Sequence, residues 1–412
     1  MKELINHPCR GVLCKSYTYN SNIMTSFAGE RSSVSSNDRK DTHEYNAVGI
    51  DVEPNLGGRG GACTAIISNS FLILFGGGDR KPSCMSDLWK YTFPNDETND
   101  INGKWECIPD GGNGEVPMAR TESSMISYDK YVFLFGGIDM SNLANVEKEN
   151  YGDDEDSGIS LYNELYVLNT ETWEWKYVGE SGCEIDGRSN HSLNIVETNL
   201  NNKYLVLFGG AHPEKGPNND TYIAKLPPTS EGISVEDFFV KWEKVETELR
   251  PTAREMHASC TLDEKVYISG GKIGTDLFDD VWQFSIEEEE NDNEDKKKCE
   301  WKKVSQMSLK TPRCGHGMVT GGVSNRDIII FGGVLGTSFM SGISIKSDFI
   351  AYTVPNEGDT FSSTWKNIYE NNEKIRPRFA SSLCSKDDGT LIVFGGVNET
   401  DDYGDIIILN KK

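Results

Sequence analysis

Six arginines recur along the 412-residue chain, and their type and spacing suggest a site for anions. They are Arg59, Arg120, Arg188, Arg254, Arg313 and Arg378. Three residues after each comes a small or imidazole side chain: Ala62, Ser123, His191, His257, His316 and Ser381. A ring of such cations could grip a carboxylate or an acidic peptide, because guanidinium groups bind carboxylates through paired hydrogen bonds. The alternative is structural, with each arginine paired to a carboxylate or to carbonyls of a neighbouring unit. We favour it because the arginine recurs in every unit.

Side chains directly beside the arginines differ from one unit to the next, so they are better candidates for partner specificity. They are Glu122, Asn190, Glu255 and Phe379. Together with the six arginines they form the candidate partner-binding site.

Three histidines, His191, His257 and His316, occupy one position in consecutive units and suggest a metal or an acid–base site. The plainer interpretation is a repeat position that accepts Ser, Ala or His, with the imidazole hydrogen-bonded between units. We prefer the plainer interpretation and expect no metal and no cofactor.

Motifs for catalysis are absent from the sequence. It contains no Gly-x-Ser-x-Gly elbow, no His-Glu-x-x-His motif and no Walker-type phosphate loop. The glycine-rich run around Arg59 lacks the strand-to-helix context of a dinucleotide fingerprint. We therefore expect no catalytic residues.

The elements that position these side chains are short apolar runs, each ending in a glycine pair. The pairs begin at Gly76, Gly136, Gly209, Gly270, Gly332 and Gly395. A β-branched and aromatic run bounded by glycines is typical of a strand buried on both faces. The pair indicates a positive φ or a neighbouring strand too close for a Cβ.

Two further strands are expected after each glycine pair. An acidic or amide residue introduces the third strand at Asp87, Asn163, Asp220, Asp280, Asp348 and Asp405. A tryptophan marks the fourth at Trp105, Trp175, Trp242, Trp301 and Trp365. Residues 235–242 could instead be helical, but the repeat phase favours a short turn entering a strand there.

This order of arginine, Gly-Gly strand, aromatic strand and tryptophan strand resembles the kelch repeat in all six units, from about Tyr45 onward. The resemblance implies an all-β, six-bladed propeller with four antiparallel strands per blade. It also implies that partners bind on the face built from the links before strand one and between strands two and three. Kelch-type oxidases use copper through a Tyr/His/Cys constellation, and specifier-type kelch proteins use iron. Neither set of ligands can be placed here.

The last unit lacks a tryptophan strand, whereas Tyr45 precedes Arg59 by 14 residues and stands where a tryptophan would stand. We expect the N-terminal strand to complete the last blade, so that deleting residues 40–50 unfolds or aggregates the protein. Residues 45–412 should form one domain. Residues 1–44, rich in Ser, Asn and charge, should form a mostly flexible tail.

The composition is acidic, with 65 Asp and Glu against 41 Lys and Arg and a formal net charge of −24. This charge disfavours nucleic acid and anionic membranes as partners but allows a basic protein. No signal-peptide-like or membrane-length apolar segment is present, and ten cysteines lie scattered without zinc-like spacing. We expect a cytoplasmic monomer with reduced thiols.

The preferred functional hypothesis is a non-catalytic scaffold or adaptor that binds a partner protein through the loop face at the central channel. One alternative is the regulatory kelch domain of a larger signalling enzyme, as in protist proteins where kelch units precede a phosphatase. A third hypothesis is an enzyme acting at the channel mouth. No BTB or F-box segment precedes the repeats, so a ubiquitin-ligase adaptor would lack its usual second part.

Overall fold

The computed structural model describes most of the chain after residue 44. The described residues are 45–81, 83–94, 103–142, 158–179, 182–229, 234–289, 296–321, 326–336, 344–356, 363–369 and 374–412. The expected N-terminal tail, residues 1–44, lies outside these ranges, and so does a run of four acidic residues at 153–156.

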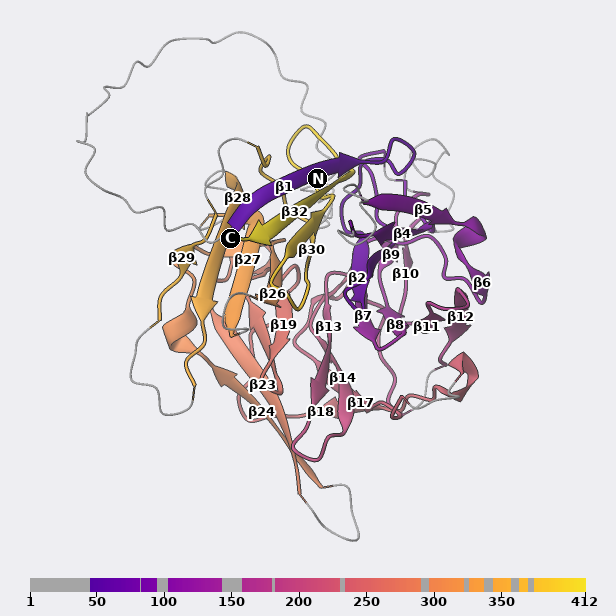
Figure 1. Cartoon of the computed structure of the whole chain (residues 1–412). Coiled ribbons are helices and arrows are strands. Elements are labelled where there is room, and N and C mark those ends of the chain that lie inside the picture. The colour runs from indigo at the N-terminus through magenta and orange to yellow at the C-terminus, as the bar shows by residue number, and fades with distance from the viewer. Residues whose placement is uncertain are drawn as a thin grey trace, which may run out of the picture.

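Within the described residues, the strands form six antiparallel blades around a channel, which confirms the predicted propeller (Figure 1). Blade 1 comprises β2 (Cys63–Ile67), β3 (Phe71–Phe75), β4 (Leu88–Thr92) and β5 (Lys104–Ile108). Blade 2 comprises β7 (Ser124–Tyr128), β8 (Tyr131–Phe135), β11 (Leu165–Asn169) and β12 (Glu174–Tyr177), with β6 (Asn113–Gly114) parallel to β12. Blade 3 comprises β13 (Ser192–Glu197), β14 (Lys203–Phe208), β17 (Thr221–Lys225) and β18 (Trp242–Val245).

The remaining blades repeat this meander. Blade 4 comprises β19 (Ala258–Leu262), β20 (Lys265–Ser269), β23 (Val281–Glu288) and β24 (Lys297–Lys303). Blade 5 comprises β26 (Gly317–Gly321), β27 (Asp327–Leu335), β28 (Ser344–Thr353) and β29 (Lys366–Asn367), and β25 (Arg313–Cys314) also pairs with β27. Blade 6 comprises β30 (Ser382–Ser385), β31 (Leu391–Phe394), β32 (Asp405–Lys411) and β1 (Tyr45–Val52).

The links between strands two and three carry small hairpins in three blades. These are β9 (Ile138–Asp139) with β10 (Ser160–Leu161), β15 (Ala211–His212) with β16 (Gly216–Pro217), and β21 (Lys272–Ile273) with β22 (Asp276–Leu277). We call the side of the ring that carries these links the link face. The side with the turns between strands one and two is the hairpin face.

Single 3-10 turns precede or follow some outer strands. They are η2 (Pro109–Gly111), η3 (Val235–Asp237) and η4 (Ser305–Met307). The turn at η3, followed by β18 from Trp242, confirms the prediction of a short turn rather than a helix at 235–242. Ser234 caps η3 by accepting a hydrogen bond from the backbone N–H of Glu236.

The glycine pairs have both properties predicted from the sequence. The first glycine of each pair has φ between 60° and 65°, and the second between 89° and 101°. A Cβ on Gly270 would lie 2.3 Å from the carbonyl oxygen of Arg313 in the next blade. Because both the backbone angle and the lack of space exclude a side chain, glycine is required in the pair that follows the apolar run of each second strand.

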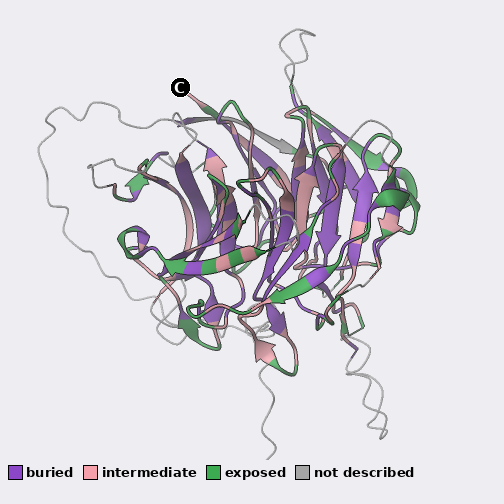
Figure 2. Cartoon of the chain, turned by 90° about the horizontal axis from the view of Figure 1, so that it is seen from below, coloured by how far each residue is buried: buried purple, intermediate pink, exposed green. Residues whose placement is uncertain are grey.

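The hydrophobic core lies between the blades, in layers where the face of one sheet packs on the next (Figure 2). Trp175 joins the layer between blades 1 and 2, and Trp301 joins the layer between blades 3 and 4. Both tryptophans are 1% exposed, so each outer strand anchors its blade to the preceding one.

The ring closes through β1, which pairs antiparallel with β32 and lies beside it in Figure 1. Tyr45 is 2% exposed and shares a hydrophobic layer with Ile407, so the predicted closure is confirmed. The register differs from the spacing argument by two residues. In blade 4, Trp301 lies opposite Phe284, the fourth residue after Asp280 at the start of the third strand. The equivalent residue of blade 6, Leu409, lies opposite Ala47 rather than Tyr45.

Candidate functional site

The six arginines are buried inside their own blades. Their exposures are 2% for Arg59, 0% for Arg120, 1% for Arg188, 0% for Arg254, 4% for Arg313 and 1% for Arg378. Each donates from its guanidinium Nη1 to the carbonyl of the first glycine of its own pair, at 2.8–3.1 Å. These donors fill a structural role, and the acceptor belongs to the same blade rather than to the neighbour.

A carboxylate at the start of the third strand completes most of these sites. The arginine partners are Asp87, Glu164, Asp280, Asp348 and Asp405. In blade 3, Arg188 instead donates to the amide oxygen of Asn218 at 3.2 Å, while Asp220 pairs with Lys244. Burial would raise the pKa of Asp280, but hydrogen bonds and charge from Arg254 outweigh burial and lower it.

An aromatic ring covers the guanidinium group in several blades. Arg120 lies 4.0 Å from the ring centre of Tyr162, and Arg378 lies 4.1 Å from that of Tyr403. These rings come from the link face and separate the arginine side chains from solvent. The cations are therefore not presented to a ligand.

The backbone around the arginines joins the blades into a ring. The second glycine of each pair donates its N–H to the carbonyl of the next blade's arginine, at 2.9–3.0 Å, including Gly396 to Arg59. A second ring runs through the residue two positions after each arginine. These residues are Gly61, Glu122, Asn190, Met256, Gly315 and Ala380, which we call the collar.

All six collar residues have positive φ, between 51° and 62°. Each donates its N–H to the carbonyl of the preceding collar residue at 2.9–3.1 Å, and Gly61 donates to Ala380, so the circuit is closed. The main chain therefore sets the width of the channel at this level, and the side chains are free to differ.

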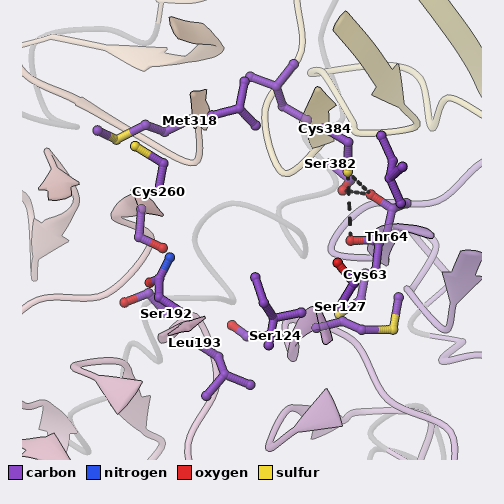
Figure 3. Close-up of a pocket in the computed structure, with 18 of the residues that line it drawn as sticks. Cys63, Thr64, Ser124, Ser127, Ser192, Leu193, Cys260, Met318, Ser382 and Cys384 are labelled. Atoms are coloured by element: carbon purple, nitrogen blue, oxygen red, sulfur yellow. Dashed lines mark hydrogen bonds between the residues drawn. The ribbon is translucent and has the colours of Figure 1, made fainter. Parts of the chain in front are cut away.

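Inside the collar, the inner strands surround a cavity of about 680 Å³ (Figure 3). Its wall consists largely of small hydroxyl, thiol and aliphatic side chains, among them Thr64, Ser124, Ser192 and Ser382. Thr64 is hydrogen-bonded to Ser382 across the seam between blades 1 and 6. Among the residues that the structure describes, no arginine or lysine lines this cavity or the collar hollow above it.

The thiols in this wall are protonated. Burial raises the pKa of Cys63 to about 11, and burial also raises the pKa of Cys260. A nucleophilic cysteine requires a lowered pKa, so neither thiol is activated for attack.

The three equivalent histidines are buried at the same level of the channel. His257 Nε2 lies 2.9 Å from the Ser192 hydroxyl, and His316 Nε2 lies 2.8 Å from that of Ser269. Burial lowers the pKa of His191 to about 3, so its imidazole is neutral. In the described parts of the chain, no group of three or more His, Cys, Asp or Glu side chains is placed to hold a metal ion.

The variable candidates lie at or behind the collar. Asn190 donates from Nδ2 to Glu122 Oε2 at 2.5 Å, which joins blades 2 and 3. Glu255 is fully buried and forms an ion pair with Lys272 at 2.6 Å. Phe379 is 5% exposed and packs in an apolar cluster on the opposite side of the ring.

Burial and the nearby carboxylate of Glu255 raise the pKa of Glu122 to about 7. Hydrogen bonds from Ser189 and Asn190 and the charge of Lys272 oppose this rise. The side chain is partly exposed and lines the collar hollow, and its charge changes near neutral pH.

Lys272 was missed by sequence reasoning. Its position follows the glycine pair and is apolar in other blades, where it holds Ile138, Ala211, Val334 and Val397. A lysine at an otherwise apolar repeat position, opposite an acidic residue, is the signal that could have identified the pair.

Comparison with known proteins agrees with this geometry. A family model described as the KLHDC2/KLHL20/DRC7 Kelch-repeats domain matches residues 151–339. An F-box/kelch-repeat protein of Arabidopsis thaliana is 27% identical over 346 residues, covering 80% of this chain and 64% of the relative. Kelch domain-containing protein 2 of Bos taurus is 28% identical over 159 residues, covering 38% of this chain and 31% of the relative. This chain is a kelch-repeat protein.

Other matches extend the comparison of this kelch-repeat protein. Host cell factor 1 of Rattus norvegicus is 26% identical over 287 residues, covering 65% of this chain and 12% of the relative. A solved structure entitled "Structure of YjhT" has a TM-score of 0.56 and 13% identity, covering 88% of this chain and 99% of that one, and it supports the fold alone. The kelch-repeat chain spans less than two thirds of the length of these curated relatives.

Two findings bear on the surroundings of this kelch-repeat protein. None of its described segments forms a helix long and apolar enough to cross a membrane. Eight cysteines fall in the described residues, and all eight carry free thiols.

Proposed function

We propose that this kelch propeller is a non-catalytic interaction module that binds a partner protein through the link face at the mouth of the channel. The collar carries the proposal: its backbone is uniform, whereas its side chains are acidic, amide, thioether, methyl or absent. A rigid ring with exchangeable side chains provides recognition without chemistry.

The site residues predicted from the sequence divide into two roles in this proposal. Glu122 and Asn190 contact the partner from the collar. Glu255, Phe379 and the six arginines act behind them, because they are buried and hold the collar in place. The free thiols of the described cysteines fit a reducing, cytoplasmic setting, and we propose that the protein acts there as a monomer.

Site-specific photo-crosslinking tests which face binds. A photo-crosslinking amino acid is placed at Asp276, exposed on the link face of blade 4, or at Glu264, exposed on the hairpin face of the same blade. We expect a discrete crosslinked partner from the Asp276 position and none from the Glu264 position. The reverse pattern would contradict the proposal.

The matches to longer relatives favour a second candidate, in which the propeller regulates a larger protein. The matched region amounts to 12% of host cell factor 1 and 31% of kelch domain-containing protein 2. Intact-mass measurement of the endogenous protein separates the two: a species much heavier than 45.9 kDa supports the regulatory-domain candidate.

A further inference from the structure

The collar is chemically lopsided. Blades 2, 3 and 4 contribute Glu122, Asn190 and Met256, whereas blades 5, 6 and 1 contribute Gly315, Ala380 and Gly61. At the level of the collar, Glu122 and Asn190 therefore form an acidic and polar half, and Met256, Gly315, Ala380 and Gly61 form a small and apolar half.

A second acidic group stands behind the polar half. Glu255 and Lys272 lie opposite each other in a β-bridge, and one carboxylate oxygen of Glu255 accepts from the Lys272 ammonium at 2.6 Å. Its other oxygen, Oε2, is buried and has no hydrogen-bond partner within the described structure. With Glu122 and Glu255 against Lys272, two carboxylates face one ammonium, and the local charge is negative when both are ionised.

The apolar half is a packed wall. Phe379, Cys314, Val334 and Val397 form one hydrophobic cluster, against which Met256 and Ala380 pack. An aliphatic stem that enters the hollow would meet Met256 and Ala380, while a charged tip would meet Glu122.

The hollow inside the collar has a volume of about 180 Å³. This is well below the roughly 300–1,000 Å³ of sites for drug-sized ligands. It suits one extended side chain rather than a folded element of a partner.

We propose that the collar receives a lysine or arginine side chain of the partner protein, with its cationic group on the Glu122 carboxylate and its stem against Met256 and Ala380. This proposal rests on the proposed function of the link face. The formal charge of −24 favours approach of a basic partner, because oppositely charged surfaces steer encounter. The buried arginines cannot compete for the same acidic group, since each already has its own acceptors.

Binding of peptide libraries to the whole chain tests the cation site, with one defined central residue in each library. The centres are arginine, lysine, norleucine, citrulline, leucine and glutamate. We expect arginine- or lysine-centred peptides to bind, and their norleucine or citrulline counterparts to bind at least tenfold more weakly. Enrichment of leucine- or glutamate-centred peptides would overturn the proposal.

Two variants and a matched control localise the effect. Glu122→Gln should weaken binding of the basic peptide at least tenfold, and Met256→Lys, which adds an ammonium to the hollow, should abolish it. Glu399→Gln removes the same charge from an exposed position of the blade 6 link and should change the affinity less than twofold. Equal effects of Glu122→Gln and Glu399→Gln would show that only overall charge matters.

Adding the same peptides to the proteins that carry the photo-crosslinker at Asp276 or at Glu264 separates the two proposals. A peptide that crosslinks there without a basic residue overturns the cation site and leaves the link-face function standing. If no peptide crosslinks at Asp276 but some crosslink at Glu264, both proposals fail. Thermal unfolding of each variant confirms that it is folded.

Discussion

Gly396 in blade 6 donates its backbone N–H to the carbonyl oxygen of Arg59 at 2.9 Å, and Arg59 directly precedes blade 1. The same hydrogen bond joins every other pair of neighbouring blades, so the seam is built like the rest of the ring. It also has an added clasp, since Arg80 of blade 1 pairs with Asp402 of blade 6 at 2.9 Å. Next to this seam, β1 completes blade 6 by pairing with β32.

Deleting residues 45–52 should prevent the chain from remaining a folded monomer. The deletion leaves one edge of β32 unpaired and uncovers the layer containing Ile407, which favours edge-to-edge association. Size-exclusion chromatography with light scattering measures the loss of monomer, and a peptide of residues 45–52 added in trans should partly restore it. Deleting residues 1–40 is the control, and similar behaviour of the two deletions would contradict the role of β1.

Arg254→Met should lower the free energy of unfolding by about 3–5 kcal/mol, because it removes the buried cation of Asp280 and leaves that carboxylate only the Trp282 N–H and the exposed Lys303. Arg250→Met is the matched control, since Arg250 is 45% exposed and its pair with Glu246 contributes about 0–1 kcal/mol. Urea unfolding of both variants gives the comparison. A similar loss in the two variants would show that the arginine position is not structural.

Gly271→Ala should be far more damaging than Gly274→Ala. Gly271 has φ of 90°, outside the left-handed α region, and a Cβ there would lie 2.8 Å from the carbonyl oxygen of Glu255, adding about 1–3 kcal/mol of overpacking to the backbone strain. Gly274 also has a positive φ of 56° but has nothing within 4 Å of the added Cβ, so only the strain applies. Thermal unfolding measures both, and equal shifts in Tm would refute the close-approach argument.

Glu122 should make the protein less stable as the pH rises. Its pKa is raised from 4.5 to about 7 in the folded state, chiefly by burial and then by Glu255. Folding therefore favours the protonated carboxyl, and this stabilisation is full below about pH 4.5 and is lost as the pH passes through 7.

Urea midpoints of the wild type and Glu122→Gln at pH 5 and pH 8 check this. Glu255 and Lys272 also influence Glu122, so only the difference between the two proteins is assigned to Glu122. The variant should show the smaller fall in stability from pH 5 to pH 8. Identical falls would mean that Glu122 does not titrate in this range.

Most of the fold could be predicted because the repeat marks every strand in the same order. The position of Tyr45 shows where spacing stops being informative. Tyr45 lies opposite Lys411, two residues from the Leu409 position at which the other blades would place a tryptophan, and the register is also irregular between Ala47 and Gly49. Counting back from Arg59 cannot reveal this pairing. The aromatic ring is buried between blades nevertheless.

Less of the site could be predicted, because burial and pairing depend on contacts between distant segments. The sequence places arginines near the channel but does not show that their own glycine carbonyls and strand-three carboxylates enclose them. The pair of Glu255 and Lys272 arises from a single β-bridge between two links. Glu255 of this pair raises the pKa of Glu122, although the two glutamates belong to blades 4 and 2. No local sequence pattern could reveal that effect.

The collar separates shape from specificity. Its closed circuit uses only main-chain atoms, and the same left-handed geometry holds Gly61, Glu122, Asn190, Met256, Gly315 and Ala380. Exchanging any of these side chains for another that tolerates positive φ would leave the aperture intact while altering its chemistry. The collar is thus a fixed backbone framework whose binding specificity natural variation or protein engineering can change one blade at a time.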